Sequence, residues 1–451
     1  MRYIILILFM TVQFAFTANA QDKSLSNHVV LISIDGFRPD FYLEEKWPAP
    51  NLQTMAKEGT RALGVRSVFP SVTYPSHTTI ITGAYPVTHG IYYNRPFEPE
   101  GQTGRWYWES SLIQTETLWD AVRKSGKTSA SLLWPVSVGA PIDYNIPEVW
   151  TLDSSYGRIK PMEDNETPKG LLKEMEGAVL GKMNETTFNG DYLNREDRTG
   201  EMGAYLLEKY KPNLMTIHLI ATDHFQHEQG RNGKKVYTAI AAIDRAIGKI
   251  IEAAERAGIS DETTFIITGD HGFVDIHSAI SPNIWLKEEG LLQEQENAST
   301  WKAKFHTSGA SAFLMLKSKN DTATINKVRQ KLDLLPQSYS KLFRIVERPE
   351  LAAIGADPNA VLALAPIAGL AMSPSFKGAV LNPKSGGTHG YFPDFQQIEA
   401  GFIAWGAGIS SGKEVPKMGL EDIAPLISEL LDLNFKAENG ILFSGILKGT
   451  N

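Results

Sequence analysis

Short, uninterrupted apolar runs alternate with helix-like segments along most of this chain, and this alternation restricts its fold more than any other feature. The run HVVLISI at 28–34 is apolar throughout, as is typical of a strand buried on both faces. Residues 235–258 instead show the spacing of a long amphipathic helix. The alternation predicts an α/β fold with a largely parallel central sheet and helices on both faces.

The expected elements can be placed along the chain. Strands are expected at 28–34, 129–134, 213–220, 263–269 and 399–406, and helices at 50–59, 115–126, 235–258 and 421–431. Thr115 is a plausible N-cap and Gly126 a C-terminal stop for the second helix. Residues 281–381 are less regular and are expected to form a smaller inserted α+β subdomain. The core would then comprise residues 28–280 and 382–445.

The N-terminus has the pattern of a secretory signal peptide over residues 1–20, with an apolar run followed by Ala-Asn-Ala. An uncleaved membrane anchor is the alternative, but the run is short for a span of roughly 20 residues. Because the chain has no cysteine, it has no disulfides. Export to a bacterial periplasm or outside the cell fits this composition. We expect no stable membrane anchor after cleavage.

The formal net charge of −7 does not suggest a nucleic-acid scaffold, which would normally carry a basic patch. A small phosphorylated substrate remains compatible with this charge, because metal ions can supply local positive charge. The sequence identifies no protein partner and no oligomeric state.

Candidate metal ligands follow several of the expected strands. Each has a plain alternative: a turn aspartate, a solvated helix face or an ordinary loop histidine. The candidates are Asp35, Asp223, His227, Asp270, His271 and His389. Carboxyl ends of parallel strands meet at one edge of a sheet, so these side chains are expected to converge. Zinc accepts imidazole and carboxylate ligands, although other divalent ions suit such sites too.

Thr73 lies in the hydroxyl-rich stretch FPSVTYPSH, immediately before Tyr74-Pro75. It can be an ordinary turn residue or a nucleophile. A threonine hydroxyl is a poor nucleophile unless a base or a metal activates it. Two metal ions can clamp an in-line displacement at phosphorus. A metal centre therefore gives Thr73 a chemical role.

The chain resembles the nucleotide pyrophosphatase/phosphodiesterase family (type I phosphodiesterases) of the alkaline phosphatase superfamily. The resemblance covers nearly the whole mature chain and rests on six motifs in family order: ISIDGFRPDFYL, APNLQTMAKEGTRA, FPSVTYPSH with TGAYPVTHGIYYN, ATDHFQHEQG, TGDHGF and GTHGY. It implies an alkaline-phosphatase-like core and two zinc ions. One zinc would be held by Asp223, His227 and His389, and the other by Asp35, Asp270, His271 and the Thr73 oxygen.

The resemblance also implies a mechanism. Thr73 would attack phosphorus, and water activated at the zinc of Asp223 would hydrolyse the threonyl-phosphoryl intermediate, releasing a nucleoside 5′-monophosphate. Asn94 and a backbone N–H near Thr73 would bind a phosphoryl oxygen. Tyr74 would stack on a nucleobase, unless it only packs in the core. A second aromatic residue is expected near Trp150 or Tyr156.

This sequence departs from the family pattern at Gln226, where a glycine is usual, and at Gly230-Arg231. His224 is an additional imidazole that either supports the ligands or points elsewhere. Related monoesterases carry a Lys and an Arg near SLLWPVSVGAPIDYNIPEVW, and this stretch has neither. We therefore expect a preference for singly charged diesters.

Three other functions stay open. Two belong to the same superfamily, a phosphonate hydrolase and a phosphomonoesterase. The third is of another class, a catalytically silent protein that binds phosphorylated ligands. The motifs also leave open whether the diester is a nucleotide, a dinucleotide, a nucleotide sugar or a lipid-derived compound.

Overall fold

The computed structural model of the protein describes residues 24–295 and 298–449. The predicted signal peptide at 1–20 lies outside the described residues. Within them, every helix is too short or too polar to cross a membrane.

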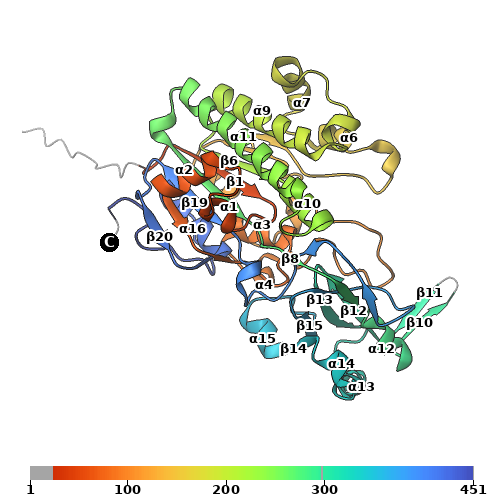
Figure 1. The fold of residues 1–451 in the computed structure, drawn as a ribbon. Helices are drawn as coiled ribbons and strands as arrows, with labels where there is room; N and C mark the ends of the chain where they lie inside the picture. The colour runs from red at the N-terminus through yellow and green to blue at the C-terminus, as the bar shows by residue number, and fades with distance from the viewer. Residues whose placement is uncertain (1–23, 296–297, 450–451) are drawn as a thin grey trace, which may run out of the picture.

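An eight-stranded sheet forms the centre of the molecule, as expected (Figure 1). Only β19 runs antiparallel to its neighbours among the described strands of this sheet, so the sheet is largely parallel. The strand order is β20 (Lys413–Val415), β2 (Thr60–Ala62), β19 (Phe402–Gly406), β7 (Thr263–Gly269), β1 (His28–Ile34), β6 (Leu214–Leu219), β4 (Ser129–Leu132) and β5 (Tyr144–Ile146). The predicted α/β class is confirmed.

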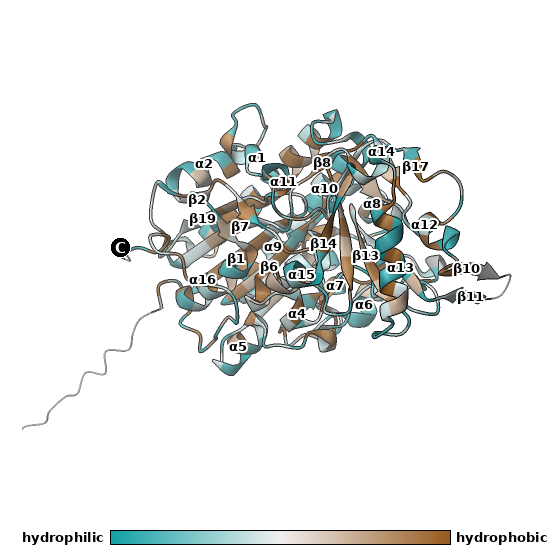
Figure 2. Cartoon of the chain, turned by 90° about the horizontal axis from the view of Figure 1, so that it is seen from below, coloured by the Kyte–Doolittle hydropathy of each residue, from teal (hydrophilic) through white to brown (hydrophobic). Residues whose placement is uncertain are grey.

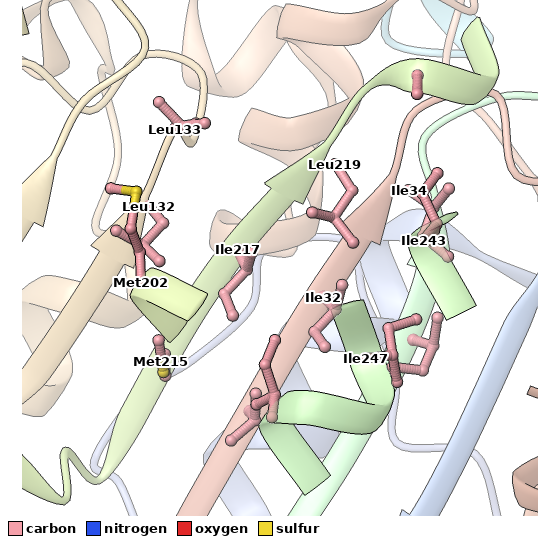
Figure 3. Packing of buried hydrophobic residues seen from close by; sticks show 14 of the residues in the cluster. Ile32, Ile34, Leu132, Leu133, Met202, Met215, Ile217, Leu219, Ile243 and Ile247 are labelled. Atoms are coloured by element: carbon pink, nitrogen blue, oxygen red, sulfur yellow. The ribbon is translucent and has the colours of Figure 1, made fainter. Parts of the chain in front are cut away.

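Helices cover both faces of this sheet. One face packs against α2 (Pro50–Glu58), α9 (Tyr192–Tyr210) and α11 (Lys234–Arg256), and the other against α3 (Thr73–Thr82), α5 (Leu118–Lys124) and α16 (Ile423–Leu430). Successive side chains of β1 enter the two layers in turn, because side chains alternate along a strand. Ile32 and Ile34 pack toward α11, beside Ile243 and Ile247 (Figure 3). Each fully buried aliphatic side chain contributes about 1.5–3 kcal/mol.

The shorter elements connect these layers or lie at their edges. They are α1 (Asp40–Leu43), α4 (Pro86–His89), α6 (Ile159–Asn165), α7 (Leu171–Met175), α8 (Glu185–Phe188), α10 (Ala221–Gln229), β3 (Val65–Arg66), β8 (Val274–Asp275), β18 (Gly387–Thr388) and β21 (Met418–Gly419). The helix α9 and the extent of α3 were not predicted from the sequence.

One helix start was predicted wrongly. The helix expected from Thr115 begins at Leu118, and its N-cap is Thr117. Thr117 Oγ1 accepts a hydrogen bond from the Asp120 N–H, and the Asp120 carboxylate accepts one from the Thr117 N–H. This reciprocal capping box fixes the helix start two residues later than Thr115 would.

A second, antiparallel sheet lies within residues 281–381, beside the large one (Figure 1). Its order is β12 (Ala303–Ser308), β13 (Ser311–Leu316), β15 (Leu362–Pro366) and β14 (Phe343–Glu347). Around it lie α12 (Asn283–Glu288), α13 (Thr322–Asp333), α14 (Gln337–Ser340), α15 (Arg348–Ala353) and the hairpin of β10 (Leu292–Gln295) and β11 (Ala298–Trp301). A three-stranded sheet of β16 (Leu370–Met372), β9 (Ser278–Ile280) and β17 (Leu381–Pro383) adjoins it.

This second sheet has its own apolar cluster, which includes Trp285, Phe305 and Leu364. Hydrophobic residues concentrate in strands such as β13, whereas α13 is largely hydrophilic (Figure 2). The boundaries 28–280, 382–445 and 281–381 stay a prediction.

Candidate active site

Three neighbouring strands of the large sheet end at the same level and deliver most of the candidate ligands. Ile34 of β1 is in register with Leu219 of β6 and with Gly269 of β7. Asp35 follows β1, Asp270 and His271 follow β7, and α10 begins just after β6. The ligands converge because parallel strands bring their carboxyl ends to one edge.

The first group of ligands consists of Asp35, Asp270 and His271, and all three side chains are buried. His271 Nε2 lies 3.3 Å from Asp35 Oδ1 and 3.2 Å from Asp270 Oδ2. The chain leaves the strand at Gly269, where a Cβ atom would lie 2.4 Å from the Phe37 carbonyl oxygen. This turn lets two adjacent residues face one point.

The second group consists of Asp223, His227 and His389. Asp223 and His227 lie one turn apart on α10, with Asp223 Oδ1 3.3 Å from His227 Nε2. His389 Nε2 lies 3.5 Å from the same oxygen. The His227 side chain is 42% exposed. This group therefore opens to solvent, where a substrate and a water molecule can approach.

The three histidines share one hydrogen-bond pattern. Nδ1 of His227 lies 2.9 Å from the Gly387 carbonyl oxygen, Nδ1 of His389 lies 2.9 Å from that of Ser71, and Nδ1 of His271 lies 3.0 Å from that of Gly272. A carbonyl oxygen only accepts, so each neutral ring carries its proton on Nδ1. The Nε2 lone pairs then face the carboxylates, which is the arrangement of a metal ligand.

Several polar atoms at this point have no hydrogen-bond partner although they are buried. They are Asp35 Oδ1, Asp223 Oδ1, Asp270 Oδ2 and His271 Nε2. Buried polar atoms are rarely left unpaired in native proteins. Here acceptors face acceptors, and a cation would satisfy them together. The donor set of carboxylates and imidazoles fits a divalent metal such as zinc.

The titration behaviour of the carboxylates points the same way. Burial, followed by the charge of Asp223, raises the pKa of Asp35 to about 6. Burial, followed by the charge of Asp35, raises the pKa of Asp270 to about 7. The protein places these carboxylates together at an energetic cost that a bound cation would remove.

The two ligand groups adjoin each other, and Thr73 lies beside one of them. The rings of His271 and His389 stack with centroids 3.6 Å apart. Thr73 Oγ1 lies 3.5 Å from Asp35 Oδ2. Thr73 is the first residue of α3, so its hydroxyl lies at the positive end of a ten-residue helix, where negative charge is stabilised.

The helix α3 is fully buried although it is rich in hydroxyl groups. Its own backbone accepts hydrogen bonds from two of them: Thr78 Oγ1 donates to the Tyr74 carbonyl oxygen, and Thr82 Oγ1 to that of Thr78. His77 Nδ1 lies 2.8 Å from the Thr73 carbonyl oxygen. These bonds hold the first turn, and with it Thr73, against the sheet.

Asn94 lies beside Thr73 in a hollow of about 210 Å³. Its Oδ1 accepts a hydrogen bond of 2.9 Å from the Tyr74 N–H. The Tyr74 N–H is therefore not free to bind a phosphoryl oxygen. A free backbone N–H near Thr73 was expected from the sequence in that role. The Asn94 amide nitrogen is left to donate to a ligand in the hollow.

Aromatic residues form one wall of this hollow. Trp150 lines it, whereas Tyr156 does not and is 59% exposed. Trp106, which the sequence analysis missed, lies edge-on between the rings of Tyr74 and Trp150, with centroids 5.0 Å from each. Tyr74 is only 1% exposed. A planar ligand would therefore meet mainly the partly exposed Trp106 and Trp150, and the stacking role of Tyr74 stays a prediction.

The hollow also has a cationic side chain, that of Arg158. This weakens the expectation of a diester preference, which rested on the absence of Lys and Arg from residues 131–150. Arg158 lines the hollow and lies 4.5 Å above the Trp150 ring. It comes from a later loop, so the absence of Lys and Arg in the earlier stretch did not exclude a cation near Thr73. The buried Glu148 also lines the hollow.

The structure explains two positions at which this sequence differs from the family pattern. Gln226 is buried, and its Nε2 donates to the Gly36 carbonyl oxygen, which ties α10 to the turn after β1. His224 does not point away from the site: it lines the hollow and stacks on Tyr192, with ring centroids 3.7 Å apart.

Two further histidines, His218 and His77, lie behind the ligands and were not singled out as site residues from the sequence. His218 Nε2 lies 3.3 Å from Asp35 Oδ2, and the His218 ring contacts His77 with centroids 4.3 Å apart. His218 is the one imidazole in the largely apolar run NLMTIHLI. That interruption of a buried strand was a signal available in the sequence.

Comparison with known proteins identifies the family of this chain. Residues 29–355 match the model of type I phosphodiesterase / nucleotide pyrophosphatase. The chain belongs to this family. Among its relatives, a venom phosphodiesterase of Naja atra is 24% identical over 429 residues, which cover 91% of this chain and 45% of the relative. Ectonucleotide pyrophosphatase/phosphodiesterase family member 7 of Mus musculus is 24% identical over 263 residues, or 56% of this chain and 51% of the relative. The chain thus spans about half the length of these relatives.

Solved structures of the family have the same fold. Human ectonucleotide pyrophosphatase/phosphodiesterase 5 superposes with a TM-score of 0.66 at 20% identity, covering 92% of this chain and 97% of that one. The murine protein gives the same values as an inactive variant, with alanine in place of a threonine, in complex with AMP. The likeness supports the alkaline-phosphatase-like architecture expected for the core.

Proposed function

We propose that this protein hydrolyses phosphodiester or pyrophosphate bonds in small nucleotide substrates and releases nucleoside 5′-monophosphates. The observation that carries the proposal is the convergence of a threonine hydroxyl, at a helix N-terminus, on two groups of facing carboxylates and imidazoles. The naming of relatives as nucleotide pyrophosphatases and phosphodiesterases supports it. So does the AMP complex of the murine neighbour.

Two divalent metal ions, zinc by ligand type, would be held by the two groups of ligands. Asp223, His227 and His389 would hold one, and Asp35, Asp270 and His271 the other. Bound there, the ions would neutralise phosphoryl charge and lower the pKa of coordinated hydroxyl groups.

The residues of the chain then have defined parts. Thr73 Oγ1 attacks phosphorus, which forms a threonyl-phosphoryl bond and breaks the bond to the leaving alcohol or phosphate. The Asn94 amide donates to a phosphoryl oxygen, and the N-terminus of α3 stabilises the charge that builds up there. Water then cleaves the threonyl ester and restores the hydroxyl group. Trp106 and Trp150 offer stacking surfaces for a base, worth about 1–3 kcal/mol.

A phosphomonoesterase is the second candidate, and Arg158 is the observation that favours it. A guanidinium group that lines the same hollow as Thr73 can bind the additional charge of a phosphomonoester dianion. We retain the diester as first candidate because the aromatic wall fits a nucleoside moiety.

The experiment that decides between the candidates compares initial rates on four substrates: a 5′-nucleotide aryl ester, a bis-aryl phosphate, an aryl monophosphate and phosphonoacetate. The proposal predicts the highest kcat/KM for the nucleotide ester. A higher value for the monophosphate or for phosphonoacetate would replace the proposal with phosphomonoesterase or phosphonate hydrolase activity. No turnover of any substrate at full metal loading would indicate a binding protein.

We further propose that the protein is exported, on the strength of the signal-peptide pattern at 1–20. N-terminal sequencing of protein recovered from outside the cytoplasm would test this, since cleavage is expected after Ala20.

A further inference from the structure

A second, larger cavity lies on the other side of the segment that carries Asn94. It measures about 820 Å³, within the range of roughly 300–1,000 Å³ typical of small-molecule sites. Its walls come from residues 92–107 and from the smaller sheet with α13. Nothing in the proposed mechanism uses this cavity.

The cavity combines aromatic walls with four cations, of which only Arg329 is paired with a carboxylate that the structure describes, that of Glu347. Tyr92, Tyr107 and Trp301 line it, and the Trp301 indole N–H is fixed by a 2.9 Å bond to the Pro99 carbonyl oxygen. The exposed Lys317, which also lines it, has an ammonium group without a hydrogen bond or ion pair to any atom that the structure describes. A cation in a cavity with aromatic walls suits an anion with a planar ring system.

Two more cations strengthen this electrostatic character. Arg348 donates only to the carbonyl oxygens of Asp357 and Ala360, and no carboxylate of the described chain lies at ion-pair distance from it. Lys319 Nζ donates to the neutral amide oxygen of Asn359. Two acids, Glu100 and Asp357, also line the cavity, and Asp357 already accepts hydrogen bonds from the Tyr93 hydroxyl and from Asn359. Lys317, Lys319 and Arg348 thus line the cavity without an ion pair to any carboxylate that the structure describes.

We propose that this cavity is a second ligand site, for a small aromatic phosphate. Its phosphate would meet Lys317, Lys319 and Arg348, because phosphate accepts charge-assisted hydrogen bonds from such groups. Its ring would pack on the tyrosines and Trp301. A nucleoside monophosphate and a simple aryl phosphate share this chemistry.

This cavity and the candidate active site share a wall. Tyr92, Tyr93 and Tyr107 face the cavity, while their neighbours Asn94 and Trp106 line the active site. The Tyr107 N–H donates to the Asn94 carbonyl oxygen at 3.3 Å, which joins the two parts of the segment. A ligand in the cavity would thus contact residues adjacent to those that hold the substrate.

Isothermal titration calorimetry of the full chain with AMP, phenyl phosphate, adenosine and inorganic phosphate tests the proposal. Lys317→Glu is the test variant, since Lys317 has no contact to lose, and the exposed Lys341→Glu is the matched control. We expect one AMP site to weaken at least tenfold in Lys317→Glu and to stay unchanged in Lys341→Glu. Tyr92→Ala should weaken the same site. Adenosine and phosphate alone should bind at least tenfold more weakly than AMP.

The comparison of AMP with phenyl phosphate shows which aromatic phosphate the cavity prefers. Equal AMP binding in the Lys317→Glu and Lys341→Glu variants would overturn the proposal. So would phosphate binding as tight as that of AMP, because the aromatic walls would then have no part. Failure of the proposed hydrolysis can be told apart from failure of this second site. A protein without hydrolytic activity would still bind AMP in the cavity, and Lys317→Glu would still weaken that binding.

Discussion

Individual residues define the chemistry of the candidate active site. Asp223 Oδ1 faces two imidazole nitrogens, and Asp35 Oδ2 faces the Thr73 hydroxyl. These atoms are oriented by bonds made on their far sides, such as the carbonyl contacts of each histidine Nδ1. Arg158, by contrast, lines the same hollow but lies outside every motif that identified the ligands.

Replacing Arg158 tests how the site discriminates charge. We expect Arg158→Ala to lower kcat/KM for an aryl monophosphate by about tenfold or more, because a hydrogen bond to a charged group is worth about 1.5–3 kcal/mol. The effect on a singly charged diester should be smaller. Parallel kinetics with the surface variant Arg123→Ala provide the control. Equal losses on both substrates would show that Arg158 does not read charge.

Single elements hold these residues in place, and some of them can be perturbed without touching the site. Thr117→Ala removes the N-cap of α5 and should lower the free energy of unfolding by about 1 kcal/mol. Thr115→Ala should change it by less than half of that amount. Urea denaturation of the two variants distinguishes Thr117 from Thr115 as the cap, and a larger loss for Thr115→Ala would reverse this assignment.

The strand β12 contains a pH-sensitive histidine far from the metal ligands in sequence. Burial lowers the pKa of His306 to about 4, and the side chain packs against Tyr93 with ring centroids 4.5 Å apart. The unfolded chain binds this proton near pH 6.5 and the folded chain only near pH 4. Stability from this group is therefore present above pH 6.5 and is lost as the pH falls to 4.

Urea denaturation at pH 7 and pH 4 measures this effect. Between these values the wild-type chain should lose about 3 kcal/mol more than His306→Gln, since each unit of pKa shift corresponds to about 1.4 kcal/mol. Other titrating groups contribute equally to both proteins and cancel in the difference. If both lose the same stability, His306 is protonated in the folded protein at pH 4 without penalty.

The elements that could be predicted from sequence are those whose burial leaves a simple pattern. The strands β1 and β7 match their apolar runs at both ends, because every side chain in them is buried. The helix α9 was missed because it buries Arg195 and Glu196 among apolar residues. The extent of the helix α3 was not predicted, because all ten of its residues are buried and no apolar stripe marks it.

The whole molecule assembles the site from distant segments. Strand ends supply most of the metal ligands, and this part could be predicted, because the carboxyl ends of parallel strands must meet. The wall of Trp106, Trp150 and Arg158 comes from loops that meet in space, where Trp106 and Arg158 both contact the Trp150 ring. No spacing in the sequence places these three residues together.

Metal binding should stabilise the whole molecule. Removal of the ions with EDTA leaves the buried carboxylates Asp35 and Asp270 facing each other, so Tm should fall. A metal present at about 100 times its Kd contributes about 2.7 kcal/mol. Zinc should restore Tm in the wild-type chain and have much less effect on Asp270→Asn. A Tm unaffected by EDTA in a metal-analysed sample would contradict metal binding at these ligands.

The most direct test of the account compares wild-type and Thr73→Ala protein in hydrolysis of a 5′-nucleotide aryl ester, with metal content measured on both samples. We predict about two metal ions per chain in the wild type, and a loss of kcat of about 10³-fold or more in Thr73→Ala. The control Thr88→Ala, in the neighbouring helix α4, should keep full activity. Substantial turnover by a well-folded Thr73→Ala protein would show that Thr73 is not the nucleophile.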